Sequence, residues 1–103
     1  MSELGDRVLR LRKAKGLSLQ KVADISDMSK GYVWELEKGN SVRPSADKIA
    51  GLARALGVTV DYLISGGASL ADAEDQAFFL VYMSLTGEKK NQMREILKVI
   101  CGR

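Results

Sequence analysis

Apolar residues recur at helical spacing along most of the chain, and no segment shows the strict alternation of a half-buried strand. Leu4, Val8 and Leu11 fall on one face of a helix predicted over residues 3–14. The same reasoning predicts two short helices within 18–39, a helix from Ser45 to Gly57, a short helix capped by Thr59, and helices over 70–85 and 87–101. We therefore expect an all-α fold of seven helices.

The segment 18–39 reads as two short helices joined by a tight turn. Ser18 and Ser29 are N-cap residues for the two helices, and Gly39 ends the second. We place the turn at Asp24 to Met28, where Asp27 tolerates the left-handed conformation. This arrangement is typical of the helix-turn-helix unit, whose second helix enters the major groove of DNA.

The second of these helices has two distinct faces. Val33, Leu36 and Glu37 point one way, and the opposite face carries Lys30, Gly31, Trp34, Glu35 and Lys38. Lysine, tryptophan and glutamate together suit the reading of base edges better than plain solvation.

The helix that follows has Ile49, Leu52, Ala53 and Leu56 on its buried side. Gly51 lies inside this helix at a cost of roughly 1 kcal/mol relative to alanine, so a close packing contact is expected there. In the short fifth helix we expect Leu63 and Ile64 to point inward.

Gly66 and Gly67 mark a break in the chain, which we interpret as a linker over 66–69 between a domain at 1–65 and a helical region at 70–103. The run from Ala77 to Met83 is apolar on all sides of its helix, so one neighbouring element cannot cover it. In the last helix Met93, Ile96, Leu97 and Ile100 form a ridge able to cover part of it. We predict a dimer interface made of Phe78, Phe79, Leu80, Tyr82, Met83, Ile96, Leu97 and Ile100. The alternative is a helical hairpin folded back on its own domain, which would leave a monomer.

Composition narrows the function classes. The chain has 103 residues and a net charge of +3, and residues 1–64 hold 11 Lys and Arg against 8 Asp and Glu. This excess favours a polyanionic partner such as nucleic acid. No histidine occurs and Cys101 is the only cysteine, so we expect no zinc site, metal or cofactor, and no enzyme activity. No membrane-length apolar run or signal peptide is evident, and we expect a cytoplasmic protein without a membrane partner.

Several blocks at consistent spacing carry a resemblance to a known family. They are 11–18, 33–39, 43–45, 52–58 and 61–63. The segment Leu4 to Ile64 resembles a Cro/cI-type (XRE-like) DNA-binding domain, the five-helix fold of lambdoid phage repressors. The resemblance implies a lambda-repressor-like domain, and the apolar pattern over 70–101 adds a two-helix dimerisation element after it. It also implies a structural ion pair between Arg12 and Glu37.

The candidate base-reading residues are Lys30, Gly31, Trp34 and Glu35. The alternative is a solvated or packing role for Lys30, Trp34 and Glu35, and sequence drift without a role for Gly31. The candidate phosphate or minor-groove contacts are Ser18, Gln20, Ser29, Tyr32, Asn40, Arg43 and Ser45. Simple capping is the alternative for the serines. Many family members carry Gln as the first residue of the second helix, whereas this chain has Leu19 there and Gln20 next.

The sequence thus predicts a sequence-specific DNA-binding transcriptional regulator, a repressor acting as a homodimer on a palindromic operator in double-stranded DNA. The alternative is a protein-interaction module, antitoxin-like or bound to a stress regulator, with DNA binding secondary.

Overall fold

The computed structural model describes residues 3–39, 43–67 and 69–102. This part of the chain holds seven helices and no strand, which confirms the all-α prediction. The helices are α1 (Glu3–Ala14), α2 (Leu19–Ser26), α3 (Lys30–Lys38), α4 (Ala46–Leu56), α5 (Val60–Ser65), α6 (Leu70–Ser84) and α7 (Gly87–Cys101). Within the described ranges, no helix is both long and apolar enough to cross a bilayer.

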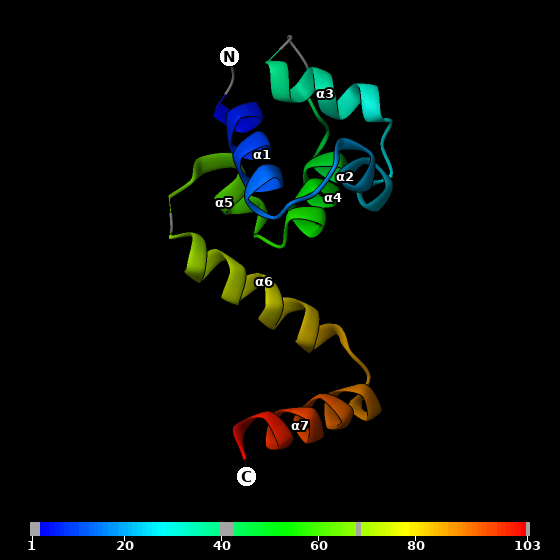
Figure 1. The fold of residues 1–103 in the computed structure, drawn as a ribbon, viewed down its shortest axis with the longest axis vertical. Helices are drawn as coiled ribbons and strands as arrows, with labels where there is room; N and C mark the ends of the chain where they lie inside the picture. Colours follow the sequence, from blue (N-terminus) through cyan, green and yellow to red (C-terminus); the bar gives the residue numbers. More distant parts are fainter. Residues whose placement is uncertain (1–2, 40–42, 68, 103) are drawn as a thin grey trace.

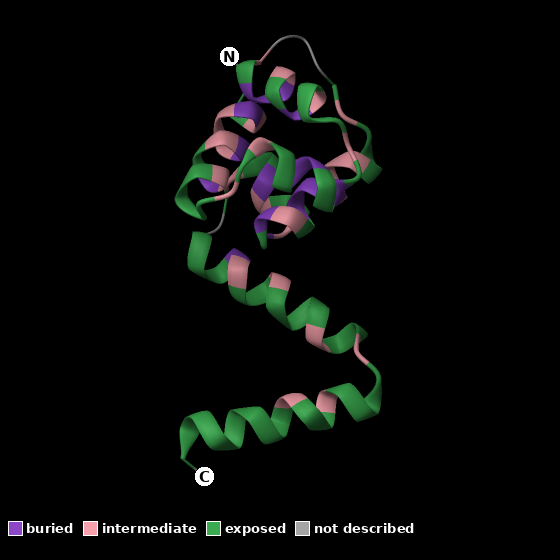
Figure 2. Cartoon of the chain, turned by 45° about the vertical axis from the view of Figure 1, so that its right-hand side comes forward, coloured by how far each residue is buried: buried purple, intermediate pink, exposed green. Residues whose placement is uncertain are grey.

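Helices α1 to α5 gather round one hydrophobic core, and α2 packs most extensively on α4 and α3 (Figure 1). The largest fully buried side chains come from all five helices: Val8, Val22, Val33, Leu36, Leu52, Leu56 and Leu63. Figure 2 shows the buried residues confined to this compact end of the molecule, apart from one at the start of α6. The core therefore lies on the helix faces that the spacing of the apolar residues predicted.

The turn between α2 and α3 is shorter than the sequence predicted. Asp24 and Ile25 belong to α2, which continues to Ser26, so the placement of the turn from Asp24 was wrong at its start. Asp27 takes the left-handed conformation with φ 56°, and its backbone N–H donates to the carbonyls of Ala23 and Asp24. The helix ends because of the capping geometry at Asp27. The polar side chain of Asp24 does not end it.

Gly51 explains how α2 and α4 approach so closely. A Cβ at this position would lie 3.0 Å from the carbonyl oxygen of Ser26 and 3.2 Å from its Cβ. Ser26 is buried, and its hydroxyl donates to the carbonyl of Val22 in the preceding turn. The expected close contact at Gly51 is confirmed, and its partner is the last turn of α2.

Two apolar residues lie further out than predicted. Ile64 is 52% exposed, since Leu63 already occupies the inward position of α5 and the next residue turns about 100° away. Ile49 is only partly buried at the edge of the core. The inward prediction for Ile64 was wrong.

The chain beyond α5 forms an extended arm. Helix α6 leads away from the compact domain and α7 turns across at its far end (Figure 1). The radius of gyration is 15.5 Å, above the ~13 Å expected for a compact chain of this length. Ala73 is the one buried residue of α6, and α7 has none. The fold-back alternative is therefore wrong for this structure, and the α7 ridge does not cover α6.

Candidate nucleic-acid interface

Helix α3 is fixed to α1 by an ion pair. Arg12 Nε donates to Glu37 Oε2 at 2.7 Å, and Arg12 Nη2 donates to Glu37 Oε1 at 3.0 Å. Arg12 Nη1 also donates to the carbonyl of Leu17 at 2.9 Å, which ties the start of α2 to the same group. The side chains are 13% and 5% exposed. The guanidinium of Arg12 therefore joins α1, α3 and the segment that leads into α2.

The pair also affects the ionisation of Arg12. The hydrogen bond to Glu37 raises the pKa of the Arg12 guanidinium above its ordinary value, with burial acting in the opposite direction. A raised pKa on a basic group adds stability that is lost only as pH climbs through that pKa. The Arg12 contribution therefore stays intact through the neutral range.

With Val33, Leu36 and Glu37 buried, the other face of α3 points to solvent. Lys30, Gly31 and Lys38 are exposed, Trp34 is 43% exposed, and Glu35 is partly buried. The four residues predicted to read bases therefore share one face and lie along a single helix. Lys38 Nζ stands 5.4 Å from the centre of the Trp34 ring, which places a cation beside that indole.

The fold gives no reason for a glycine at position 31. A Cβ there would meet nothing within 4 Å, and the backbone is ordinary helix. A glycine inside a helix costs roughly 0.5–1 kcal/mol against alanine. Open space outside the domain is what a helix backbone needs in order to approach another molecule closely.

Three serine hydroxyls stand at helix N-termini. Ser18, Ser29 and Ser45 are exposed, and their oxygens accept from the backbone N–H of Lys21, Tyr32 and Lys48 at 3.0, 3.0 and 3.3 Å. Each is therefore a cap, and its hydroxyl hydrogen can still be donated outward. The Gln20 amide donates to Asp24 Oδ1 at 2.7 Å, so this side chain lies along its own helix.

Lys48, which the sequence did not single out, links the start of α4 to the start of α3. Lys48 Nζ of α4 lies 4.1 Å from the centre of the Tyr32 ring of α3, and both side chains are partly buried. The ring holds the ammonium group beside the start of α3. The two residues are sixteen positions apart, and no local pattern signals their contact.

The remaining predicted residues fall in two places. Arg43 is exposed and precedes Pro44 and α4, and Asn40 lies outside the described residues. The predicted dimer residues lie on α6 and α7, at the opposite end of the long axis from α3 (Figure 1). In the described segments, no group of three or more His, Cys, Asp or Glu side chains could hold a metal ion.

Comparison with known proteins agrees with this geometry. The family model described as a helix-turn-helix domain matches residues 3–63, which are α1 to α5. An HTH-type transcriptional regulator, DdrOP3 of Deinococcus deserti, is 34% identical over 64 residues, covering 62% of this chain. The chain spans about half the length of that curated relative, because the match covers 49% of it.

Two solved structures share the fold. The clp gene regulator ClgR from C. glutamicum is 33% identical, with a TM-score of 0.55 over 65% of this chain and 90% of that one. A structure of the SinR protein/SinI protein complex matches with a TM-score of 0.57 and 19% identity, covering 97% of this chain and 99% of the matched chain. The second match shows likeness of fold, including the region of α6 and α7. From the family match over α1 to α5 and the regulator relative, the chain belongs to the XRE-like, Cro/cI-type family of helix-turn-helix transcriptional regulators.

Proposed function

We propose that this regulator is a repressor that binds a palindromic operator as a homodimer, with α3 reading base edges in the major groove. The observation that carries the proposal is the outer face of α3, where Lys30, Gly31 and Trp34 are exposed beside an open backbone. Lysine donates to guanine acceptors, and an exposed indole can contact a thymine methyl. Proteins of the matched family are generally not enzymes, which favours binding as the activity.

Phosphate contacts would flank the reading helix. The start of α2 offers Ser18, the start of α3 offers Ser29, and Lys48 with Tyr32 offers a cation and a hydroxyl. Arg43 adds a second cation, which is exposed and precedes α4. Phosphate contacts of this kind fix orientation and supply affinity, while base contacts supply sequence preference.

Dimer formation would use α6 and α7. Ten of the fourteen large hydrophobic residues exposed among the described residues lie on these two helices, including Phe78, Phe79, Leu80 and Ile100. An apolar surface of this extent requires a partner, and an identical chain is the commonest one. A dimer would hold two copies of α3 for half-sites about one DNA turn apart, roughly 34 Å.

Selection of bound sequences from a random pool of DNA tests the proposal. We expect a palindromic consensus for the wild-type protein. The Lys30→Ala variant should lose roughly 1–3 kcal/mol of specific binding and relax the preference at one base pair in each half. An equal loss on every single-base operator variant would show that Lys30 reads no base, and a pool without enrichment would remove sequence-specific binding altogether.

The phosphate contacts have their own test, which is the dependence of affinity on salt. Arg43→Ala and Lys48→Ala should each weaken binding to all sequences together and lower the slope of log affinity against log salt by about 1. Lys89→Ala is the matched control, because Lys89 is exposed on α7 far from α3. A slope equal to that of the wild type in either variant removes that residue from the phosphate contacts.

A protein partner is the second candidate for the apolar surface. The SinR match comes from a complex with SinI, and it extends over α6 and α7. A different protein could occupy this surface of the present chain in place of a second copy. Sedimentation equilibrium distinguishes the two, since a chain that needs another protein stays monomeric alone.

A further inference from the structure

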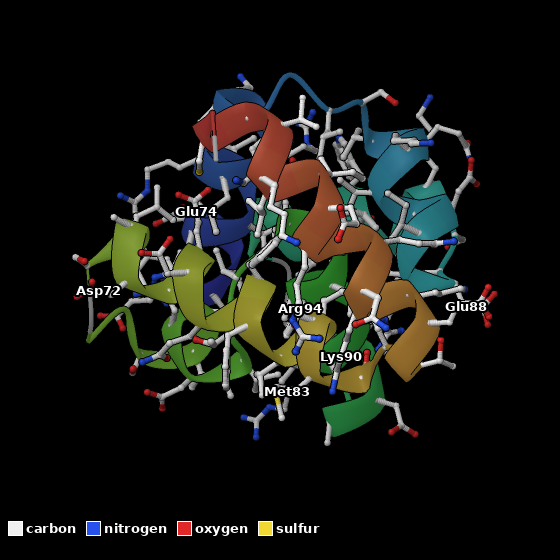
Figure 3. The ribbon with its side chains drawn as sticks, turned by 90° about the horizontal axis from the view of Figure 1, so that it is seen from below. Asp72, Glu74, Met83, Glu88, Lys90 and Arg94 are labelled. Atoms are coloured by element: carbon white, nitrogen blue, oxygen red, sulfur yellow. The ribbon has the colours of Figure 1, made fainter. Side chains whose placement is uncertain are left out.

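The first turn of α6 is attached to the DNA-binding domain. Ala73 is 1% exposed and belongs to the same buried cluster as the residues of α1 to α5. Next to it, Glu74 Oε2 accepts from Lys15 Nζ at 2.5 Å, just after the end of α1. Figure 3 shows Glu74 on the side of α6 next to α1, whereas Met83 lies well along the helix. The base of the arm therefore rests on the domain at two adjacent residues.

The end of α5 is also held. Arg7 Nη1 donates to the carbonyls of Leu63 and Ile64 at 2.6 and 3.1 Å, which satisfies acceptors of the last helical turn. Gly66 then takes the left-handed conformation with φ 63°, and a Cβ there would lie 2.8 Å from Arg7 Nη2. The chain therefore leaves the domain in one defined direction, fixed by Arg7 before the glycines and by Ala73 after them.

The direction of α6 matters because the helix is long. Its 15 residues span about 22 Å. A rotation of about 10° at the base would move the far end by about 4 Å, close to the ~3.4 Å between base pairs along one strand. A small change of angle at the start of α6 therefore displaces the dimer contacts by about the distance between neighbouring base pairs.

Stability alone explains the ion pair at this joint poorly. An exposed ion pair such as Lys15 with Glu74 contributes little to the free energy of unfolding. The buried cluster is otherwise built from α1 to α5 and the residues joining them. Ala73 and Glu74 both hold the start of α6 against the domain that carries α3.

We propose that Ala73, Glu74 and their partner Lys15, together with Arg7, determine the spacing between half-sites that the protein accepts. The inference rests on the proposed homodimer through α6 and α7. It makes operator spacing a property of a small joint in the chain, separate from the base preference of α3. Because one added base pair also rotates a half-site by about 35° around the DNA, a rigid joint should discriminate sharply between spacings.

The test uses the full chain and a series of operators with the two half-sites moved apart or together in single base-pair steps. The wild type should prefer one spacing by about tenfold or more over its neighbours, because two linked sites are bound together only when the geometry matches. Ala73→Arg and Glu74→Lys should flatten or shift this optimum. Binding to a single half-site and the dimer population in sedimentation equilibrium should not change.

Asp72→Lys is the control, because Asp72 is exposed in the same helical turn and the charge change is identical. It should keep the wild-type profile. If Ala73→Arg does not fold, Glu74→Lys still decides, since its side chain is on the surface. A wild-type optimum in Glu74→Lys, or a dimeric wild type without any optimum, overturns the inference. A monomeric wild type overturns the proposed dimer and the inference with it, and sedimentation distinguishes that failure.

Discussion

Replacing Arg12 by alanine should lower the free energy of unfolding by about 3–5 kcal/mol. The substitution leaves the Glu37 carboxylate, 5% exposed, without either of its two guanidinium hydrogen bonds. It also removes the donor to the Leu17 carbonyl. Domains of this size are stable by roughly 5–15 kcal/mol, so the variant should melt far below the wild type. Chemical denaturation followed by circular dichroism measures the change.

A double-mutant cycle with Glu37→Gln isolates the contact between the two side chains. We expect a coupling energy well above experimental error, because the residues share two hydrogen bonds. Lys13→Ala is the control, since Lys13 is the exposed neighbour on α1 and its loss should change stability by less than about 0.5 kcal/mol. Additive effects in the cycle would mean that the two side chains do not depend on each other in solution.

The local features of the fold could be predicted because each is encoded within a few residues. Ser18, Ser29, Ser45 and Thr59 were expected at or near helix starts, and each accepts from the backbone N–H three residues later. Side-chain capping of this kind depends only on residue type and position. The left-handed conformation at Asp27 follows from equally local chemistry.

The features that could not be predicted depend on residues far apart in the chain. Lys48 lies over Tyr32, and Ala73 enters a core otherwise formed before residue 64. Ile64 was predicted to point inward because it is apolar, yet Leu63 takes the one buried position of this six-residue helix. Periodicity assigns residues to a face but does not say which element that face meets. For α6 and α7 the sequence correctly signalled excess apolar surface, but it could not tell a folded hairpin from an open arm.

Ile96→Glu should convert a dimeric protein into a monomer and reduce affinity for a palindromic operator by about 10²- to 10⁴-fold, the gain that two linked sites provide. Ile96 is 53% exposed on α7, so a charge there costs the single chain little. In a dimer built on this surface, the same charge would lose its water and have no partner. Separation of the two reading helices removes the gain from simultaneous binding, which accounts for the loss of affinity without any change in base contacts.

Val60→Glu is the control, because Val60 is also an exposed β-branched residue, 40% exposed on α5 of the compact domain, and it gains the same charge. It should leave the molecular mass in sedimentation equilibrium and the operator affinity as in the wild type. A DNA titration with a single half-site should give equal affinity for both variants and the wild type, because neither residue lies near α3. If Ile96→Glu remains dimeric at tens of micromolar, the two copies meet elsewhere; if both variants become monomeric, the contact extends onto the compact domain. The first result would move the interface away from α6 and α7, and with it the basis for spacing control by the joint at Ala73.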